Sequence, residues 1–185
     1  PIANRVKLKL TASGKDLDAL ENQLEEEISK VRPLLKAHII SENGDKIEEI
    51  LHDLLISRNL TISTAESCTG GELSHLITSV SGSSNYFLGG ICTYKTEKKT
   101  EILGVSEDLI KEKTVVSAEV AEAMSLGCQK LFKTDIALST TGVAGPNSDE
   151  FNTEIGTVFY SIRVKDFEKT FRLYLPHLER KDFMN

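Results

Sequence analysis

The chain has 185 residues, of which 39% are apolar and 27% are charged, and its formal net charge is −6. This composition is typical of a soluble globular protein with one core of about 130 to 150 residues and a small additional unit. The sequence shows no signal peptide and no apolar run long enough to span a membrane. Its acidic balance disfavours nucleic acid as a partner, because duplex-binding surfaces concentrate Lys and Arg.

The three cysteines, Cys68, Cys92 and Cys128, are widely spaced and odd in number, so they match neither a disulfide framework nor a zinc pattern. They predict a reducing, cytoplasmic location. The chain starts at Pro1 instead of a methionine, and we expect it to be part of a longer protein.

Residues 1–43 are predicted to form a small β-α-β subdomain. Its first strand and its helix follow from alternating and helically spaced apolar residues: Val6, Leu8 and Leu10, then Leu17, Leu20, Leu24, Ile28 and Val31. Pro33 is expected to end the helix. A second strand is predicted over residues 37–40, before a turn at residues 41–44.

From residue 44 to residue 185, helical and strand patterns alternate. Helices are predicted over 47–55, 73–80, 98–103 and 118–128, and strands over 60–66, 90–94, 136–140, 156–164 and 169–175. The last two strands form a predicted hairpin over residues 165–168. This order predicts a layered α/β/α sandwich with a mixed sheet.

The segment from Leu60 to Gly71 is the most informative for function. A strand pattern runs into small hydroxyl residues and two glycines, and Ser67 to Gly71 therefore joins a strand to a helix N-terminus. Free backbone N–H groups and the positive end of the helix dipole gather at such a turn. We expect it to hold a phosphate or a developing oxyanion.

Glycine-containing segments also follow two other strands, at Gly89-Gly90 and at 140–146. In open α/β sheets, ligands bind outside the carboxyl ends of strands, so the segments at 67–71 and 140–146 are predicted to meet in one crevice. Neither segment matches a P-loop, a Rossmann fingerprint or a nucleophile elbow.

If Ser67 is a nucleophile, its base is a lysine in preference to a histidine, because all four histidines lie in unsuitable places. Tyr94 and Lys99, five residues apart after a strand, are candidates, although most lysines are exposed surface charges. Cys68 competes for the nucleophile role, since a helix N-terminus lowers a thiol pKa. A purely structural role for Ser67 as a helix cap is the simplest alternative.

Several motifs in fixed order resemble the CinA C-terminal domain family. They are Thr64-Ala65-Glu66-Ser67-Cys68-Thr69-Gly70-Gly71, Gly89-Gly90-Ile91-Cys92-Thr93-Tyr94 with Lys99 and Leu103-Gly104-Val105, Thr141-Gly142-Val143-Ala144-Gly145-Pro146, and Gly156-Thr157-Val158. The resemblance covers residues 44–185. Residues 1–43 resemble the small linking subdomain that precedes this domain, and a molybdopterin-binding-like domain of the family is expected to be missing from this chain.

The resemblance implies that nicotinamide mononucleotide is hydrolysed to nicotinate mononucleotide and ammonia. It implies Ser67 as the nucleophile, Lys99 as the general base and Tyr94 as the hydrogen-bonding partner of Lys99. Substrate-binding residues on this interpretation are Thr69, Gly70, Gly71, Thr141, Gly142 and Arg180, with Arg180 contacting the phosphate. The scheme requires no metal and no cofactor.

The chain departs from the family in the loop 147–154, which is acidic where glycines and a Lys-Pro pair are usual, and at Lys95-Thr96, where Ser-Asn is usual. These changes leave open a second hypothesis, a nucleotide-binding or assembly module with weak or lost catalysis. We also expect a homodimer, whose interface the sequence does not locate.

Overall fold

A computed structural model of the chain describes residues 6–184, apart from the side chain of Ala37. The chain divides into two compact units, the first ending at Ile50 and the second beginning at Leu51. We describe each unit by itself.

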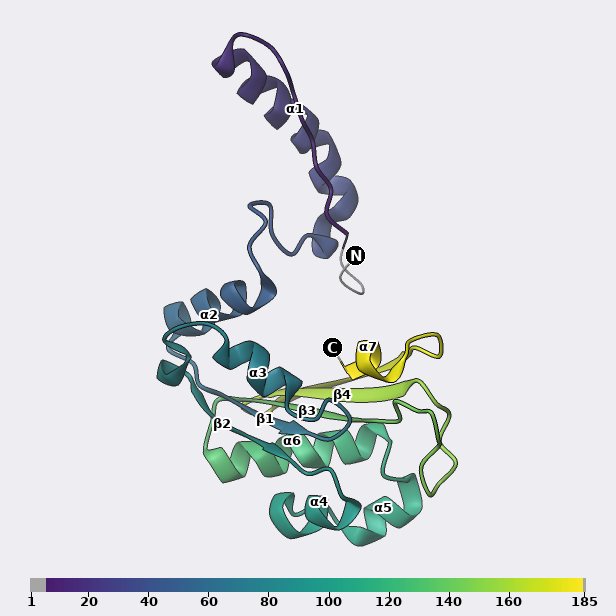
Figure 1. Cartoon of the computed structure of the whole chain (residues 1–185). Coiled ribbons are helices and arrows are strands. Elements are labelled where there is room, and N and C mark those ends of the chain that lie inside the picture. Colours follow the sequence, from purple (N-terminus) through teal and green to yellow (C-terminus); the bar gives the residue numbers. More distant parts are fainter. Residues whose placement is uncertain (1–5, 185) are drawn as a thin grey trace. The chain divides into compact units, whose positions relative to one another are not determined.

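The first unit is built on one long helix, α1 (Leu17–Leu35), followed by the short 3-10 helix η1 (Lys36–His38) (Figure 1). The Asp16 carboxylate caps α1 by accepting a hydrogen bond from a backbone N–H in its first turn. No residue of α1 is buried. Polar contacts link the helix to the loop that follows, where the Arg32 guanidinium donates to both carboxylate oxygens of Glu42 at 2.7 Å.

The predicted β-α-β arrangement of this unit is wrong for the described residues. Residues 6–13 form no strand, and of the predicted strand at 37–40, residues 37 and 38 belong to η1 while residues 39 and 40 form no strand. Alternating apolar residues give an extended segment one apolar face, but a strand also needs a neighbouring strand with which to pair. The described part of this unit offers none. The helix continues past Pro33 to Leu35, because a proline so near the end removes only one intrahelical hydrogen bond. Residues 1–5 of the predicted subdomain lie outside the described residues.

The second unit contains a five-stranded mixed sheet. Its strands are β1 (Ile62–Glu66), β2 (Phe87–Cys92), β3 (Ile136–Gly142), β4 (Thr157–Val164) and β5 (Phe167–Tyr174), in the order β2-β1-β3-β4-β5. Strands β1, β2 and β3 are parallel, whereas β4 and β5 are antiparallel to their neighbours. The interior strand β1, between β2 and β3, is buried along its whole length, as expected of a strand with a helix layer on each face.

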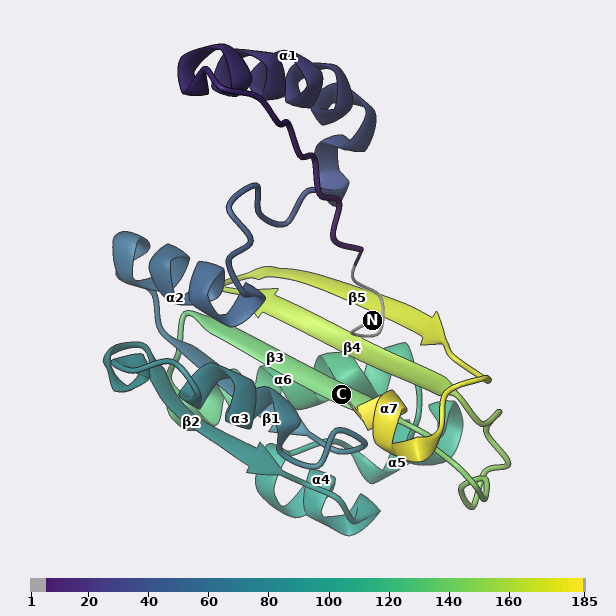
Figure 2. The same ribbon diagram turned by 45° about the horizontal axis from the view of Figure 1, so that its top comes forward.

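Helices cover both faces of this sheet, as Figures 1 and 2 show. They are α2 (Ile47–Arg58), α3 (Glu72–Thr78), α4 (Thr96–Leu103), α5 (Glu107–Lys113), α6 (Ala118–Phe132) and α7 (Arg180–Met184), with the 3-10 turn η2 (Ser83–Asn85). Helices α4, α5 and α6 lie on one face, and α3 and α7 lie on the other with the part of α2 from Leu51 onward. The predicted α/β/α sandwich is therefore confirmed for this unit.

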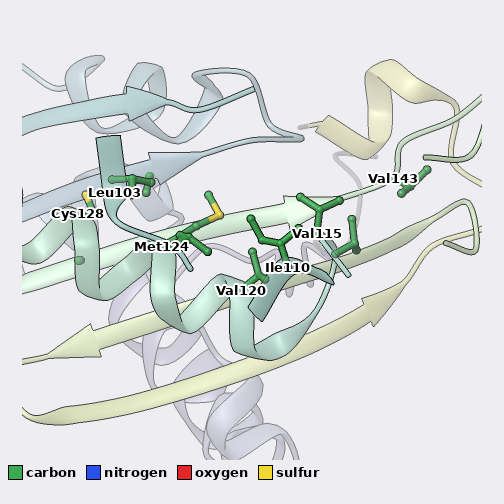
Figure 3. Packing of buried hydrophobic residues seen from close by; sticks show 11 residues of the cluster. Leu103, Ile110, Val115, Val120, Met124, Cys128 and Val143 are labelled. Carbon is green, nitrogen blue, oxygen red and sulfur yellow. The ribbon is translucent and has the colours of Figure 1, made fainter. Parts of the chain in front are cut away.

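The main apolar core lies between α6 and the sheet, where Met124 and Val120 of α6 are fully buried (Figure 3). Leu103 at the end of α4 and Ile110 of α5 pack on the same cluster. A second cluster on the opposite face contains Leu55, Ile62, Ile77 and Tyr86, and a third, beneath α7, contains Cys68, Ala144, Val158 and Phe183. Within residues 6–184, no helix combines the length and apolar composition that crossing a membrane requires.

Most predicted elements of this unit match observed ones, with three differences. Strand β2 begins three residues before the predicted start at residue 90, α5 was not predicted, and the β4–β5 turn is only Lys165-Asp166. In that turn Val164 pairs directly with Phe167, so residues assigned to the loop extend β5.

Candidate active site

Parallel pairing brings the predicted chemical residues to one edge of the sheet. Ser67 follows β1, Tyr94 follows β2 closely, and Thr141 lies near the end of β3. Because these three strands are parallel, their carboxyl ends meet at the same edge. The predicted meeting of the segments at 67–71 and 140–146 therefore takes place there, joined by the segment after β2.

Lys99 and Ser67 form a buried pair at this edge. Lys99, on the second turn of α4, places its Nζ 3.1 Å from Ser67 Oγ and 2.7 Å from the Thr93 carbonyl oxygen. Lys99 is 1% exposed, and within the described chain no carboxylate forms an ion pair with it. Burial lowers the pKa of Lys99 from its ordinary value of 10.5 to about 8. A lysine in this state can accept a proton near neutral pH.

Cys68 does not compete with Ser67 for activation. Its side chain belongs to the apolar cluster beneath α7, and burial raises the pKa of the Cys68 thiol to about 11. Since the thiolate is the reactive form of cysteine, Cys68 is chemically quiet at neutral pH. The Ser67 hydroxyl, by contrast, has a base within hydrogen-bond distance.

An open pocket of about 780 Å³ lies over this pair. It is lined by Ser67 and Lys99 at its base, and by Cys68, Tyr94, Lys95, Thr96, Glu97, Val115, Val116, Thr141, Gly142, Val143, Ala144, Gly145, Asn147, Ser148, Asp149, Glu150 and Arg180. This volume lies within the range of about 300–1,000 Å³ that is typical of small-molecule sites.

Arg180 and Tyr94 form part of the pocket wall together. Arg180, the first residue of α7, donates from Nη1 to the Gly145 carbonyl oxygen at 2.9 Å and from Nη2 to the Tyr94 hydroxyl. The expected hydrogen bond between Tyr94 and Lys99 is absent, because the Lys99 amine points inward to Ser67 and Thr93 while Tyr94 is half exposed. Tyr94 therefore contacts the predicted phosphate-binding arginine instead of the predicted base.

Thr141 and Gly142, two of the predicted substrate-binding residues, line the pocket. The Thr141 hydroxyl is already committed, since it donates to the Val115 carbonyl oxygen at 2.8 Å. Gly142 is needed for close packing: a Cβ built there would lie 2.7 Å from the Thr157 carbonyl oxygen. The Thr141 hydroxyl is therefore not free to donate to a ligand, and Gly142 contributes only backbone to the pocket lining.

Thr69, Gly70 and Gly71 do not line the pocket, and the N–H groups predicted to be free there are largely occupied. The Gly70 N–H donates to the Ser67 carbonyl oxygen at 3.2 Å, and the Gly71 N–H donates to the Glu66 carboxylate at 2.9 Å. The Thr69 hydroxyl also donates to Glu66, at 2.8 Å. The sequence analysis did not anticipate that the carboxylate of Glu66, one residue before Ser67, accepts these hydrogen bonds at the N-terminus of α3. In residues 67–71, the amides of Ser67, Cys68 and Thr69 are the ones that no protein acceptor engages, and of these three residues Ser67 and Cys68 line the pocket.

Residues 147–150 of the acidic loop line the pocket. The loop folds on Asp149, whose carboxylate accepts hydrogen bonds from the N–H groups of Phe151 at 3.2 Å and Thr153 at 2.8 Å. Glu150 reaches across to accept from the Thr96 hydroxyl at 3.4 Å. The departures from the family pattern thus face one another across the pocket mouth.

Sequence reasoning did not identify Glu66 or Thr93 as parts of the site. Glu66 is 1% exposed and Thr93 is fully buried. A charged residue inside an otherwise buried strand pattern was a usable signal, because a buried carboxylate needs hydrogen-bond donors nearby. No group of acidic, His and Cys residues suited to a metal ion occurs in the part of the chain that the structure describes.

Comparison with known proteins agrees with the order of the motifs. The sequence model of one family, described as the CinA C-terminal domain, matches residues 44–185. A CinA-like protein of Flavobacterium psychrophilum is 47% identical over 163 residues, which are 88% of this chain and 39% of that protein. A putative competence-damage inducible protein of Caldicellulosiruptor saccharolyticus is 37% identical over 90% of this chain and 40% of its own length. The chain spans about two fifths of the length of these relatives.

Solved structures share the fold. The competence damage-inducible protein A of Klebsiella pneumoniae matches with a TM-score of 0.71 and 28% identity, over 74% of this chain and 84% of that one. A CinA superfamily protein of Escherichia coli matches with a TM-score of 0.72 and 27% identity, over 81% of this chain and 90% of that one. Since the family model covers most of the sequence and these relatives share its fold, the chain belongs to the CinA C-terminal domain family.

Proposed function

We propose that this domain is an amidohydrolase that converts nicotinamide mononucleotide to nicotinate mononucleotide and ammonia. The substrate follows from the motif resemblance, and the reaction type follows from the site. One observation carries the proposal: a buried lysine amine with a lowered pKa lies 3.1 Å from a serine hydroxyl at the base of a pocket. Such a pair can cleave an amide without the help of a histidine.

In the first half-reaction, Ser67 Oγ attacks the carboxamide carbon while the neutral amine of Lys99 accepts the hydroxyl proton. The carbonyl oxygen becomes an oxyanion, and the amides of Ser67 and Cys68, which line the pocket and have no protein acceptor, are the backbone donors proposed to stabilise it. A single such donor is worth roughly 3 kcal/mol in other hydrolases. The Lys99 ammonium then gives its proton to the amide nitrogen, the C–N bond breaks and ammonia leaves.

In the second half-reaction, a water molecule attacks the nicotinoyl ester on Ser67, and Lys99 again accepts the proton. The C–O bond to Ser67 breaks, Lys99 returns the proton to Oγ and the carboxylic acid leaves, ionised. One water is consumed for each ammonia released, and both the serine and the lysine return to their starting states. The Lys99 hydrogen bond to the Thr93 carbonyl keeps the amine aimed at Ser67 throughout.

Arg180 is the proposed partner of the 5′-phosphate. Its guanidinium lies in the pocket wall with two of its five N–H groups engaged, by Gly145 and Tyr94, which leaves donors for a phosphate. Tyr94 holds the arginine in place in this scheme. The predicted homodimer and cytoplasmic location remain proposals.

A second candidate function is nucleotide binding without turnover. The departures from the family pattern favour it, because Lys95, Thr96 and the loop residues 147–150 all line the pocket itself. This candidate predicts that nicotinamide mononucleotide raises the melting temperature while no ammonia is released.

The decisive experiment measures ammonia release from nicotinamide mononucleotide by the wild type, Ser67→Ala and Lys99→Ala. Both variants are expected to lose roughly 10³-fold or more in kcat, as nucleophile and base variants do in other hydrolases. Ser79→Ala and Lys98→Ala serve as matched controls, since both side chains are exposed and neither lines the pocket. Nicotinamide riboside, which lacks the phosphate, is expected to react about 10 to 100 times more slowly, the effect of a lost charge-assisted hydrogen bond.

The pH profile of the same reaction tests the role of Lys99. Because the neutral amine is the active form, kcat/KM is expected to rise with pH and to level off above the Lys99 pKa of about 8. Wild-type activity in a folded Ser67→Ala protein would reject the mechanism. Ligand-induced stabilisation without ammonia release by the wild type would favour the binding function.

A further inference from the structure

Glu66 is a buried carboxylate that the proposed chemistry does not use. It is 1% exposed and lies immediately before the nucleophile. In the described residues no lysine, arginine or histidine forms an ion pair with it. A charge that is removed from water in this way must be stabilised by hydrogen bonds, and the donors come from the turn that carries Ser67.

Five donors converge on the two carboxylate oxygens. Oε2 accepts from the Thr69 hydroxyl at 2.8 Å, the Gly71 N–H at 2.9 Å and the Leu73 N–H at 3.1 Å. Oε1 accepts from the N–H and the hydroxyl of Ser74 at 2.9 and 2.7 Å. The side chain thus closes residues 66–74 into a ring around its own carboxylate, and Ser67 lies on that ring.

The backbone of Glu66 connects the same residue to Lys99. Its carbonyl oxygen accepts from the Thr93 N–H at 2.9 Å, and the Thr93 carbonyl oxygen accepts from Lys99 Nζ at 2.7 Å. Lys99 Nζ lies 3.1 Å from Ser67 Oγ. Nucleophile, base and Glu66 therefore belong to one closed chain of contacts.

A glycine in β2 leaves room for this network. The Ser74 hydroxyl also pairs with the Thr64 hydroxyl at 2.8 Å, and a Cβ built on Gly90 would lie 2.3 Å from both oxygens. Any larger residue at position 90 would displace Ser74 and, with it, one side of the Glu66 carboxylate. The network therefore explains why residue 90, in the Gly89-Gly90 pair, is a glycine, although the proposed reaction does not itself require one there.

We propose that Glu66 is a positioning residue for the Ser67–Lys99 pair. Its carboxylate fixes the turn so that Ser67 Oγ stays within reach of Lys99, and it withdraws the Gly71, Leu73 and Ser74 amides from the pocket. The inference rests on the proposed function for its kinetic readout. A residue that only caps α3 would affect stability and leave the folded enzyme's kcat unchanged.

Glu66→Gln is the primary test. Glutamine has the same shape, but its NH2 group must face either the Ser74 N–H or the donors on Oε2, so at least one hydrogen bond becomes a donor–donor contact. A displacement of about 1 Å at a nucleophile can cost on the order of 10²-fold in rate. We expect kcat to fall at least about 10-fold and KM to stay within about 3-fold of the wild-type value. The rise of kcat/KM with pH should keep its midpoint near pH 8, because Glu66 is not among the groups that shift the Lys99 pKa.

Asp135→Asn is the matched control. The Asp135 carboxylate also accepts from a backbone N–H and a hydroxyl, those of Thr61 at 2.9 and 2.8 Å, but at the opposite end of β1. This variant is expected to lose stability and to keep the wild-type kcat per folded molecule. An equal loss of kcat in both variants would overturn the proposal, because it would show a general effect of loosening β1.

A fluorophosphonate probe separates this inference from the choice of substrate. The rate of Ser67 phosphonylation, followed by mass spectrometry of the intact protein, is expected to be at least about 10-fold lower in Glu66→Gln than in the wild type. Rapid labelling of Ser67 without ammonia release would reject nicotinamide mononucleotide as substrate and leave the positioning role standing. Equal labelling of wild type and Glu66→Gln, or no labelling of the wild type, would overturn the positioning role.

If Glu66→Gln does not fold, Ser74→Ala provides the second variant. It removes one of the five donors, the hydroxyl at 2.7 Å, and retains the carboxylate and all three backbone donors. We expect a folded protein whose labelling rate falls about 2- to 5-fold, corresponding to the loss of one hydrogen bond. A labelling rate equal to that of the wild type would overturn the proposal.

Discussion

The amine of Lys99 lies where water hardly reaches it, and its function and its stability make opposite demands. Burial disfavours the ammonium form, so the pKa of Lys99 falls from 10.5 to about 8. The same shift that prepares the amine to act as a base means that, near neutral pH, the folded protein carries a poorly solvated charge. Active-site residues often show this conflict between activity and stability.

The pH dependence of stability follows from that shift. The folded protein releases the Lys99 proton near pH 8, whereas the unfolded chain retains it up to about pH 10.5. Between these values the unfolded state binds more protons, so the free energy of unfolding rises with pH. Below pH 8, the buried ammonium lowers that free energy by about 3 kcal/mol.

Lys99→Met is therefore expected to abolish ammonia release and to stabilise the protein at pH 7. We expect a gain of about 1 to 3 kcal/mol, since the lost hydrogen bonds to Ser67 and Thr93 offset part of the relief. The gain should shrink towards zero at pH 10, measured by urea unfolding at both pH values. Lys98→Met, at an exposed lysine beside Glu101, should show no such gain. If the free energy of unfolding of Lys99→Met differed from that of the wild type by the same amount at both pH values, the lowered pKa assigned to Lys99 would be contradicted.

Of the helix contacts that bear on the site, the one between α6 and α4 brings two backbones closest together. A Cβ built on Gly127 of α6 would lie 2.0 Å from the Leu103 carbonyl oxygen, at the end of α4. Helix α4 carries Lys99, so the depth at which α4 packs on α6 also sets the distance from Lys99 Nζ to Ser67 Oγ.

Gly127→Ala is expected to destabilise the protein by about 2 kcal/mol or more, the cost of overpacking. In an exposed helix the same change would stabilise by up to about 1 kcal/mol, so the sign of the effect reports the helix contact. Urea unfolding gives this value, and kcat should fall as α4 shifts. Lys130→Ala, at an exposed position of α6, should stay within about 0.5 kcal/mol of the wild type. Stabilisation by Gly127→Ala would show that α4 and α6 are farther apart.

At the scale of the whole molecule, the two units differ in how they are held together. All three apolar clusters consist of residues from Leu51 onward. Helix α1 has no buried residue and relies on polar contacts such as that between Arg32 and Glu42. The second unit therefore has the buried apolar clusters that cooperative unfolding requires, whereas the described part of the first unit has none.

A protein that begins at residue 44, and so retains all of α2, is expected to unfold like the full chain. Its free energy of unfolding should lie within about 0.5 kcal/mol of the full-length value, because every apolar cluster is retained. Calorimetry and ammonia release measured on both proteins check this, and sedimentation of the same samples tests the predicted homodimer. A clear fall in melting temperature on deletion would mean that residues 1–43 contribute to the stability of the second unit.

Local sequence patterns were enough to predict the α/β order, most strands and helices of the second unit, and the strand-to-helix segment that carries Ser67. Apolar periodicity and glycine positions carry this information locally, and they predicted Ser67 at a strand-to-helix turn. The β-α-β subdomain was predicted wrongly, because the alternation of Val6, Leu8 and Leu10 marks a face without supplying a partner strand.

Which groups meet at the site depends on tertiary contacts that no local pattern encodes. The Lys99 amine reaches Ser67 across 32 residues of sequence, Arg180 reaches Tyr94 across 86, and Glu66 occupies the amides that were expected to be free. A residue pattern does not show which donors are already satisfied, because hydrogen-bond partners and desolvation depend on segments that only folding brings together.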